Sequence, residues 1–246
     1  MKIITKIAVS TTLISCFSTI GFTADLELAV AQLNRGEFKQ AIEEFKPLLI
    51  EQYAPAQYQM ALVHLNGWGV KKDSNKALDL LTLAAEQNYP DALFSLSLIY
   101  DEGLLIDKNA KKAFRLMEKA ANKKLASAQF NLGVMYANGK GTTLDSSKAV
   151  RWYEKAARQN YALAQFNLAL MYFEGKGIKK DLEMSYIWNY ISAKSGYEPA
   201  RKSRDMDENK LSIEQLKLAQ ERAETLYNQL LIQIDLRNKK LMNSPY

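Results

Sequence analysis

Apolar residues recur along this chain at helical spacing, in a register that repeats every 36 residues. A fixed period of this length is typical of a supersecondary unit that cannot bury its apolar face alone and stacks on its neighbours. The pattern therefore predicts an all-α fold, a solenoid of helix-turn-helix repeats. The four blocks that align without an insertion are Ala54–Tyr89, Pro90–Leu125, Ala126–Tyr161 and Ala162–Tyr197.

The first half of each block has the pattern of one helix. Alanine stands at the third position, methionine or leucine at the seventh, and a small residue at the eighth, where two helix backbones can approach closely. Glycine follows the last turn, where a positive φ is favoured. We expect this helix over positions 2 to about 12. The eighth-position residues are Ala61, Ser97, Gly133 and Ala169, and the glycines are Gly67, Gly103, Gly139 and Gly175.

The second half of each block predicts another helix, which begins after a residue suited to capping. An Asp or Asn side chain can accept a hydrogen bond from a free amide of the first helical turn. Apolar residues then recur at spacings of three and four. A second glycine of the turn, present in three blocks, is replaced by Leu105. The capping residues are Asp73, Asn109, Asp145 and Asp181.

The stretch from Ala126 to Ala157 reads A-x-A-Q-F-N-L-G-V-M-Y-x-N-G-x-G, then D-x-x-K-A-V-x-W-Y-x-K-A-A. This pattern resembles the Sel-one-like repeat, a subfamily of the tetratricopeptide-like helical repeats. The resemblance covers the four blocks with degenerate flanks. It implies a right-handed superhelix of helix pairs that binds other proteins or peptides on its concave face and sometimes through loops.

The flanks of the array are expected to cap it. Residues 25–53 have the spacing of a tetratricopeptide-like helix pair, in which Pro47 predicts a kink or a late helix start. Residues 198–246 begin with a truncated first helix. Ser212 and Gln215 then form a capping-box pattern that opens a helix from Ile213 to about Lys240. Its last turns could project beyond the array, meet a second molecule in self-association, or fray after Asn238.

Residues 1–24 have the layout of a secretory signal peptide: Lys2 and Lys6 precede an uncharged apolar stretch, which ends at Ala24. We therefore expect a periplasmic or secreted protein whose mature chain starts near Asp25. Cys16, the single cysteine, stands in a sequence resembling a bacterial lipobox. Lipid anchoring through it is the alternative to a free mature protein.

Composition narrows the choice of function. A formal net charge of +6 on 246 residues is mild and does not indicate a nucleic-acid binder. No segment after residue 24 is apolar enough to cross a membrane. His64, the single histidine, stands where the other blocks have tyrosine, so it is expected to pack between helices. One histidine and one cysteine cannot form a zinc centre, and neither a cofactor motif nor a catalytic constellation is found.

The candidate binding residues face the inside of the superhelix by analogy with related repeats. An aromatic ladder at the fifth block position could grip a peptide, although packing between repeats is the favoured explanation for these rings. Asn131 and Asn167 could bind a ligand backbone or satisfy neighbouring carbonyls. The candidates are Tyr58, Leu62, Asn66, Phe94, Leu98, Asp101, Glu102, Phe130, Val134, Asn138, Phe166, Leu170, Phe173 and Glu174.

These observations favour an exported, non-enzymatic scaffold with a protein or peptide partner. Two alternatives stay open: an enzyme or factor of the envelope that acts on peptidoglycan, and a secreted pathogen factor that binds a host protein. The paired lysines Lys71-Lys72 and Lys179-Lys180 lie in turns and are expected to be solvated. They could also attract acidic partners.

Overall fold

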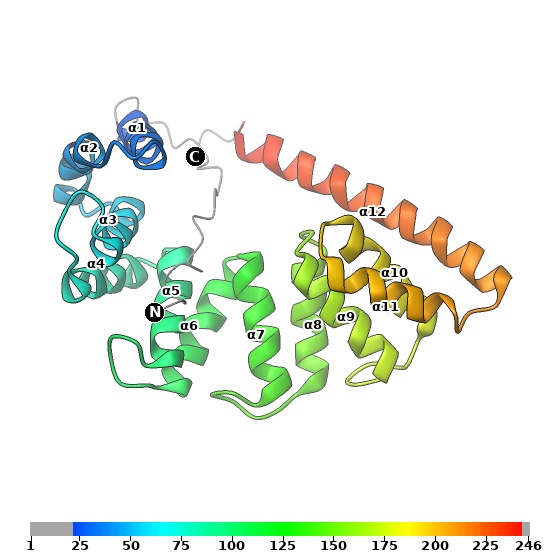
Figure 1. Ribbon diagram of the computed structural model, residues 1–246. Coiled ribbons are helices and arrows are strands. Elements are labelled where there is room, and N and C mark those ends of the chain that lie inside the picture. Colours follow the sequence, from blue (N-terminus) through cyan, green and yellow to red (C-terminus); the bar gives the residue numbers. More distant parts are fainter. Residues whose placement is uncertain (1–21, 243–246) are drawn as a thin grey trace. The chain divides into compact units, whose positions relative to one another are not determined.

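The computed structural model describes the backbone of residues 22–242 and the side chains of residues 26–240. Twelve helices and no strand occur in this part of the chain (Figure 1). The expected all-α repeat fold is therefore confirmed. Most of the expected signal peptide, including Cys16, lies outside the described residues.

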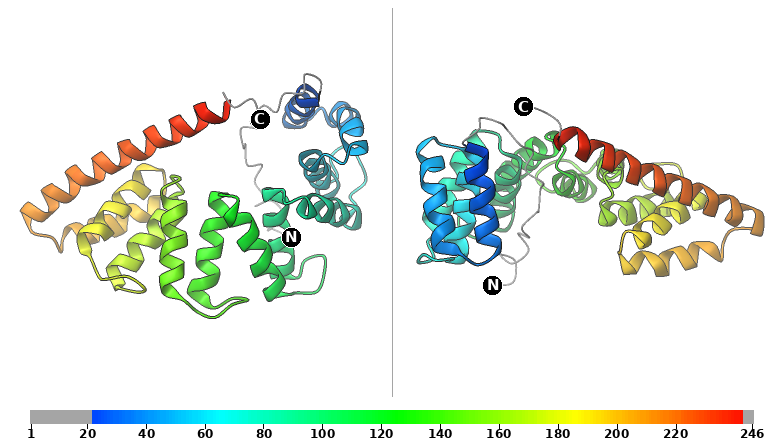
Figure 2. Two further views of the ribbon diagram at one scale, coloured as in Figure 1. Left: turned by 180° about the vertical axis from the view of Figure 1, so that it is seen from behind. Right: turned by 90° about the horizontal axis from the view of Figure 1, so that it is seen from above.

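The helices form two compact units, one containing α1 to α5 and the other running from Ala110 to Arg237. Figure 2 shows the helices of each unit from two further sides. The first unit contains α1 (Phe22–Asn34), α2 (Phe38–Ile50), α3 (Ala54–Asn66), α4 (Ser74–Glu86) and α5 (Pro90–Glu102). The second contains α6 (Ala110–Asn122), α7 (Ala126–Asn138), α8 (Ser146–Ala157), α9 (Ala162–Glu174), α10 (Leu182–Lys194), α11 (Glu198–Glu208) and most of α12 (Ile213–Met242).

The helix ends follow the local sequence signals. The side chains of Asp73, Asp145 and Asp181 accept hydrogen bonds from first-turn amides at 2.9–3.0 Å. The first helix of each block ends at a glycine with a φ between 67° and 74°. These signals confirm the predicted helix pairs.

Both flanks also contain the predicted helices. Helix α2 begins at Phe38, well before Pro47, so the expectation of a late helix start is wrong. Because Pro47 lies in the final turn, most of the helical ladder precedes it. The capping box is confirmed: the Ser212 amide donates to the Gln215 side chain at 3.0 Å, and the Gln215 amide donates to the Ser212 hydroxyl at 3.2 Å.

The second glycine of the turn allows one repeat to approach the preceding one. A Cβ on Gly141 would lie 2.1 Å from the carbonyl oxygen of Ala110, at the start of α6. A Cβ on Gly177 would lie 2.4 Å from the carbonyl oxygen of Ser146, at the start of α8. Turn and helix start thus touch backbone to backbone, which a side chain would prevent.

The small residue at the eighth block position matches a large one on the facing helix. A Cβ on Gly133 of α7 would lie 2.7 Å from the ring of Tyr153 on α8, whose side chain is buried. In the first block the equivalent positions hold Ala61 and Leu81. The bulk of Tyr153 thus explains why glycine is needed in the third block.

Replacing Gly133 with alanine should therefore destabilise the protein, by about 1–3 kcal/mol from overpacking. Adding Tyr153→Leu should recover part of the loss, because alanine opposite leucine reproduces the pair in the first block. Chemical denaturation of the two single variants and the double variant measures the coupling. Strictly additive losses would show that Gly133 and Tyr153 do not constrain each other.

Candidate protein-binding site

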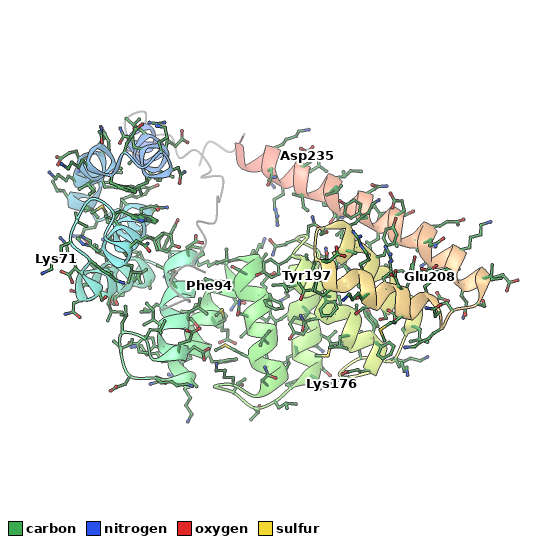
Figure 3. All side chains as sticks on the ribbon, viewed as in Figure 1. Lys71, Phe94, Lys176, Tyr197, Glu208 and Asp235 are labelled. Atoms are coloured by element: carbon green, nitrogen blue, oxygen red, sulfur yellow. The ribbon has the colours of Figure 1, made fainter. Side chains whose placement is uncertain are left out.

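In three of the four blocks, the aromatic side chain at the fifth position packs on the tyrosine that closes the same block. The ring centroids lie 5.5 Å apart for Tyr58 and Tyr89, and 5.2 Å apart for Phe166 and Tyr197. Phe130 lies 5.3 Å from Tyr161 in the same way. Figure 3 marks Tyr197, which precedes α11, and Phe94 on α5. These contacts favour packing as the main role of the fifth-position rings.

In the third and fourth blocks a buried glutamine at the fourth block position joins the helix pair to the preceding one. The side-chain amides of Gln129 and Gln165 donate to the carbonyl oxygens of Ala121 and Ala157, both at 3.2 Å. Those carbonyls belong to the final turns of α6 and α8 and also accept the backbone amides of Lys124 and Asn160 at 3.0 Å, so the glutamine is a second donor to each. The sequence analysis did not assign this role, although a glutamine recurring in an apolar helix face could have indicated it.

The predicted binding residues of the first unit differ in exposure. Tyr58 and Leu62 on α3 are buried, and Asn66 is exposed at the end of that helix. The Asn66 side-chain amide donates to the Leu62 carbonyl at 2.8 Å. On α5, Glu102 is exposed, whereas Phe94, Leu98 and Asp101 are half-buried.

In the second unit, α7 and α9 carry the predicted residues. Phe130 and Val134 are half-buried and Asn138 is exposed, as is Glu174 on α9. The amides of Asn131 and Asn167 donate to the carbonyls four residues earlier in their own helices, at 2.8 Å. Of the two roles considered for these asparagines, the structure therefore shows the bond to a neighbouring carbonyl.

Three of the predicted residues on α9 line one cavity of about 140 Å³ together with side chains of α10 and α11. They are Phe166, Leu170 and Phe173, and Leu170 is 43% exposed. The ammonium group of Lys210 lies 4.0 Å from the centre of the Phe173 ring, and that of Lys180 lies 5.7 Å from it. One lysine of the pair Lys179-Lys180 therefore contacts a ring of the predicted binding surface.

Four of the other five residues that line the cavity are polar. Asp207 of α11 is 2% exposed, and its Oδ2 accepts hydrogen bonds from Ser185 Oγ and Asn189 Nδ2, both at 2.8 Å. Burial raises the pKa of the Asp207 carboxyl above its ordinary value, and the two hydrogen bonds oppose this only in part. The sequence analysis did not identify Asp207 or Asn189 as site residues.

Helix α12 lies alongside α10 in the second unit (Figure 1). Glu224 accepts from the Tyr190 hydroxyl at 2.8 Å and pairs with Lys194 at 2.6 Å, and these contacts lower the pKa of its carboxyl. Farther along, Arg237 donates to Gln159 at 2.6 Å. Helix α12 therefore contacts other helices of the second unit as far as Arg237. The side chain of Leu236 is exposed.

Other candidate chemistry is limited in the described part of the chain. His64 is 6% exposed, neither ring nitrogen has a hydrogen-bond partner among the described residues, and burial lowers its pKa. This environment fits the expected packing role. Residues 22–242 contain no group of three or more His, Cys, Asp or Glu side chains placed to hold a metal ion, and none of their helices is long and apolar enough to span a membrane.

A model of the Sel1 repeat matches residues 54–89, 90–125, 126–161 and 162–197, so the chain belongs to the Sel1 repeat family. Proteins of this family generally act as protein-interaction scaffolds and are typically non-enzymatic. The resemblance found in the sequence is therefore confirmed, block by block.

Solved structures of other proteins resemble this chain, including the following two. A Sel1 repeat protein from Oxalobacter formigenes is 27% identical, with a TM-score of 0.67, over 71% of this chain and 72% of its own. The protective antigen c5321 of uropathogenic Escherichia coli has an SLR fold and is 24% identical, with a TM-score of 0.57, over 91% of this chain and 56% of its own. The second likeness concerns the fold alone. No curated protein matches the chain.

The buried carboxyl predicts a pH-dependent gain of stability for Asp207→Asn. Because the folded-state pKa is raised, the ionised carboxylate lowers stability at pH values above that pKa. The variant should therefore have the higher thermal midpoint at pH 7. The difference should shrink as the pH falls through the raised folded-state pKa and disappear below about 3.9, where the carboxyl becomes protonated in the unfolded state as well.

Thermal melts of both proteins between about pH 3 and pH 8 measure this difference. Asp205→Asn, which neutralises an exposed carboxylate on the same helix, controls for the change in net charge. A lower midpoint for Asp207→Asn at pH 7 would show that the carboxylate is stabilising there.

Proposed function

We propose that this protein is an exported scaffold that binds a protein or peptide partner. The binding surface is the face of its second unit formed by the first helices of the repeats, α7 and α9. The supporting observation is the apolar surface of α9. Leu170 is 43% exposed there, and the half-buried rings of Phe166 and Phe173 line the same cavity. Exposed apolar side chains beside a concave pocket are typical of partner-binding surfaces.

Family membership supports the general role, because Sel1 repeat proteins generally mediate protein interactions. The choice of α9 depends on its contrast with α3 in the first unit. The residue of α3 equivalent to Leu170 is Leu62, which is only 3% exposed. An incoming side chain would therefore find more apolar surface on α9.

Export is proposed from the charged start and apolar stretch of residues 1–24. The packing of α1 is compatible with cleavage after Ala24. The buried residues of this helix include Leu26, Ala29 and Leu33, all of which would stay in the mature chain. Removing Phe22 to Ala24 would shorten the first turn without removing these core contacts.

The double variant Phe173→Ala and Glu174→Ala should bind its partner more weakly, by about 2 kcal/mol if Phe173 is a central anchor. Helical content and thermal midpoint should change little, because both residues lie at the end of α9 beyond the buried seam. Capture from envelope extracts identifies the partner, and titration with the purified partner measures the loss.

The matched control is Lys71→Ala with Lys72→Ala, in the equivalent turn of the first block. Lys179 and Lys180 are less suitable, because Lys180 lies over the Phe173 ring. Retained binding in the Phe173 variant together with lost binding in the Lys71 variant would assign recognition to the loops rather than to α9.

Export predicts that the mature N-terminus starts near Asp25. Expression of the full chain in a Gram-negative host, fractionation and N-terminal sequencing test this. Lys2→Glu with Lys6→Glu should reduce processing, because the positive start of the signal is lost. An intact Met1 in the cytoplasmic fraction would refute export, and an acylated Cys16 would identify a lipoprotein instead.

A further inference from the structure

The polar cluster of Ser185, Asn189 and Asp207 interrupts the repeat pattern at the junction of α10 and α11. At the equivalent positions the other blocks have buried apolar side chains. Burying polar groups lowers stability unless their hydrogen bonds are complete, so packing alone favours the apolar choice. The counterparts are Ala77, Ala113 and Ala149 for Ser185; Leu81, Met117 and Tyr153 for Asn189; and Val63, Ile99, Met135 and Met171 for Asp207.

Two acceptor atoms of this cluster receive no hydrogen bond from the described residues. Both hydrogen bonds to Asp207 go to Oδ2, which leaves Oδ1 for a further donor. Asn189 is 3% exposed, and its Oδ1 accepts no hydrogen bond from any described residue. A buried acceptor without a donor is costly, and a donor group that enters the cavity beside it would remove that cost.

The cavity beside these acceptors has the size of one side chain. Its volume is about 140 Å³, close to that of cavities that hold a single benzene ring at about 150 Å³. Phe166 and Phe173 line it, and the exposed side chains of Leu170 and Met206 contribute its apolar rim. The site thus combines apolar walls with a carboxylate and an amide oxygen.

We propose that this cavity receives a lysine side chain of a protein partner, with the ammonium group on Asp207 and Asn189 and the alkyl chain against the apolar walls. The inference rests on the proposed scaffold function and names the chemistry that its site recognises. An ammonium group carries three rotatable donors and suits two separate single oxygens. A guanidinium prefers both oxygens of one carboxylate, and Oδ2 of Asp207 already accepts two bonds.

Lys210 is the like charge that an incoming lysine meets. Its ammonium group stands over the ring of Phe173, and Lys210 itself is exposed. Removing this charge should favour the entering cation, whereas removing the charge of Asp207 should disfavour it. The two substitutions are therefore predicted to act in opposite directions.

The test is an NMR titration of the isotope-labelled mature chain with Nα-acetyl-lysine amide. The uncharged norleucine analogue and the arginine analogue serve as matched probes. We expect saturable shifts at the Asn189 side-chain amide, and binding of norleucine weaker by about tenfold or more, because bonds to a charged group are lost. Asp207→Asn should weaken lysine binding by a similar factor. Lys210→Met should strengthen it, by up to about fivefold.

A second variant keeps the test decisive if Asp207→Asn alone perturbs the fold. The triple variant Ser185→Ala, Asn189→Leu, Asp207→Val restores residues found at these positions in other blocks, so it should fold at least as stably and should not bind lysine. The proposal would be overturned if no saturable shifts appear, if the norleucine analogue binds as tightly as the lysine probe, or if the arginine analogue binds more tightly. It would also be overturned if the lysine probe binds Asp207→Asn or the triple variant as tightly as the unchanged protein.

This result is separable from the fate of the scaffold proposal. The small probe reports on the cavity alone, whereas partner capture with the Phe173 and Glu174 variant reports on the wider α9 surface. Partner binding that depends on α9 without any lysine binding would leave the scaffold function intact and remove only the lysine site.

Discussion

The structure depends on the contact by which each helix pair completes the preceding one. A single pair leaves an apolar face uncovered, and the last carbonyls of its second helix have only the amides of the following turn as donors. The next pair supplies what is missing: Gln165 reaches back to the last turn of α8, and Gly177 sets its turn against the start of the same helix. Both ends of a second helix are thus held by the following repeat, and the packed face lies between them.

The same packing explains one of the places where the sequence departs from its own pattern. Glycine at position 133 goes with the bulky Tyr153, because the seam between α7 and α8 has a limited volume. Leu105 replaces the turn glycine in the second block, and the division between the two compact units falls shortly after it, at Asn109 and Ala110. At the last junction, three apolar positions become Ser185, Asn189 and Asp207.

A site placed at the end of an array can differ in sequence at little cost to the rest. The polar cluster of α10 and α11 lies where the regular blocks stop, so the remaining seams keep their apolar residues. A buried carboxylate and an unfilled acceptor reduce stability locally, as binding sites often do. The aromatic walls of the cavity come from α9, which is the first helix of the last matched repeat.

The sequence by itself determined the helix pairs, because caps, turn glycines and apolar spacing are local signals that recur with the period. It also placed Phe166, Leu170 and Phe173 on one face of a helix, since residues three and four apart are neighbours there. Only the tertiary structure decided which of the candidates meet around a cavity, and that Asp207 completes it. Asp207 comes from another helix, and contacts between distant segments depend on how the pairs stack, which no local pattern specifies.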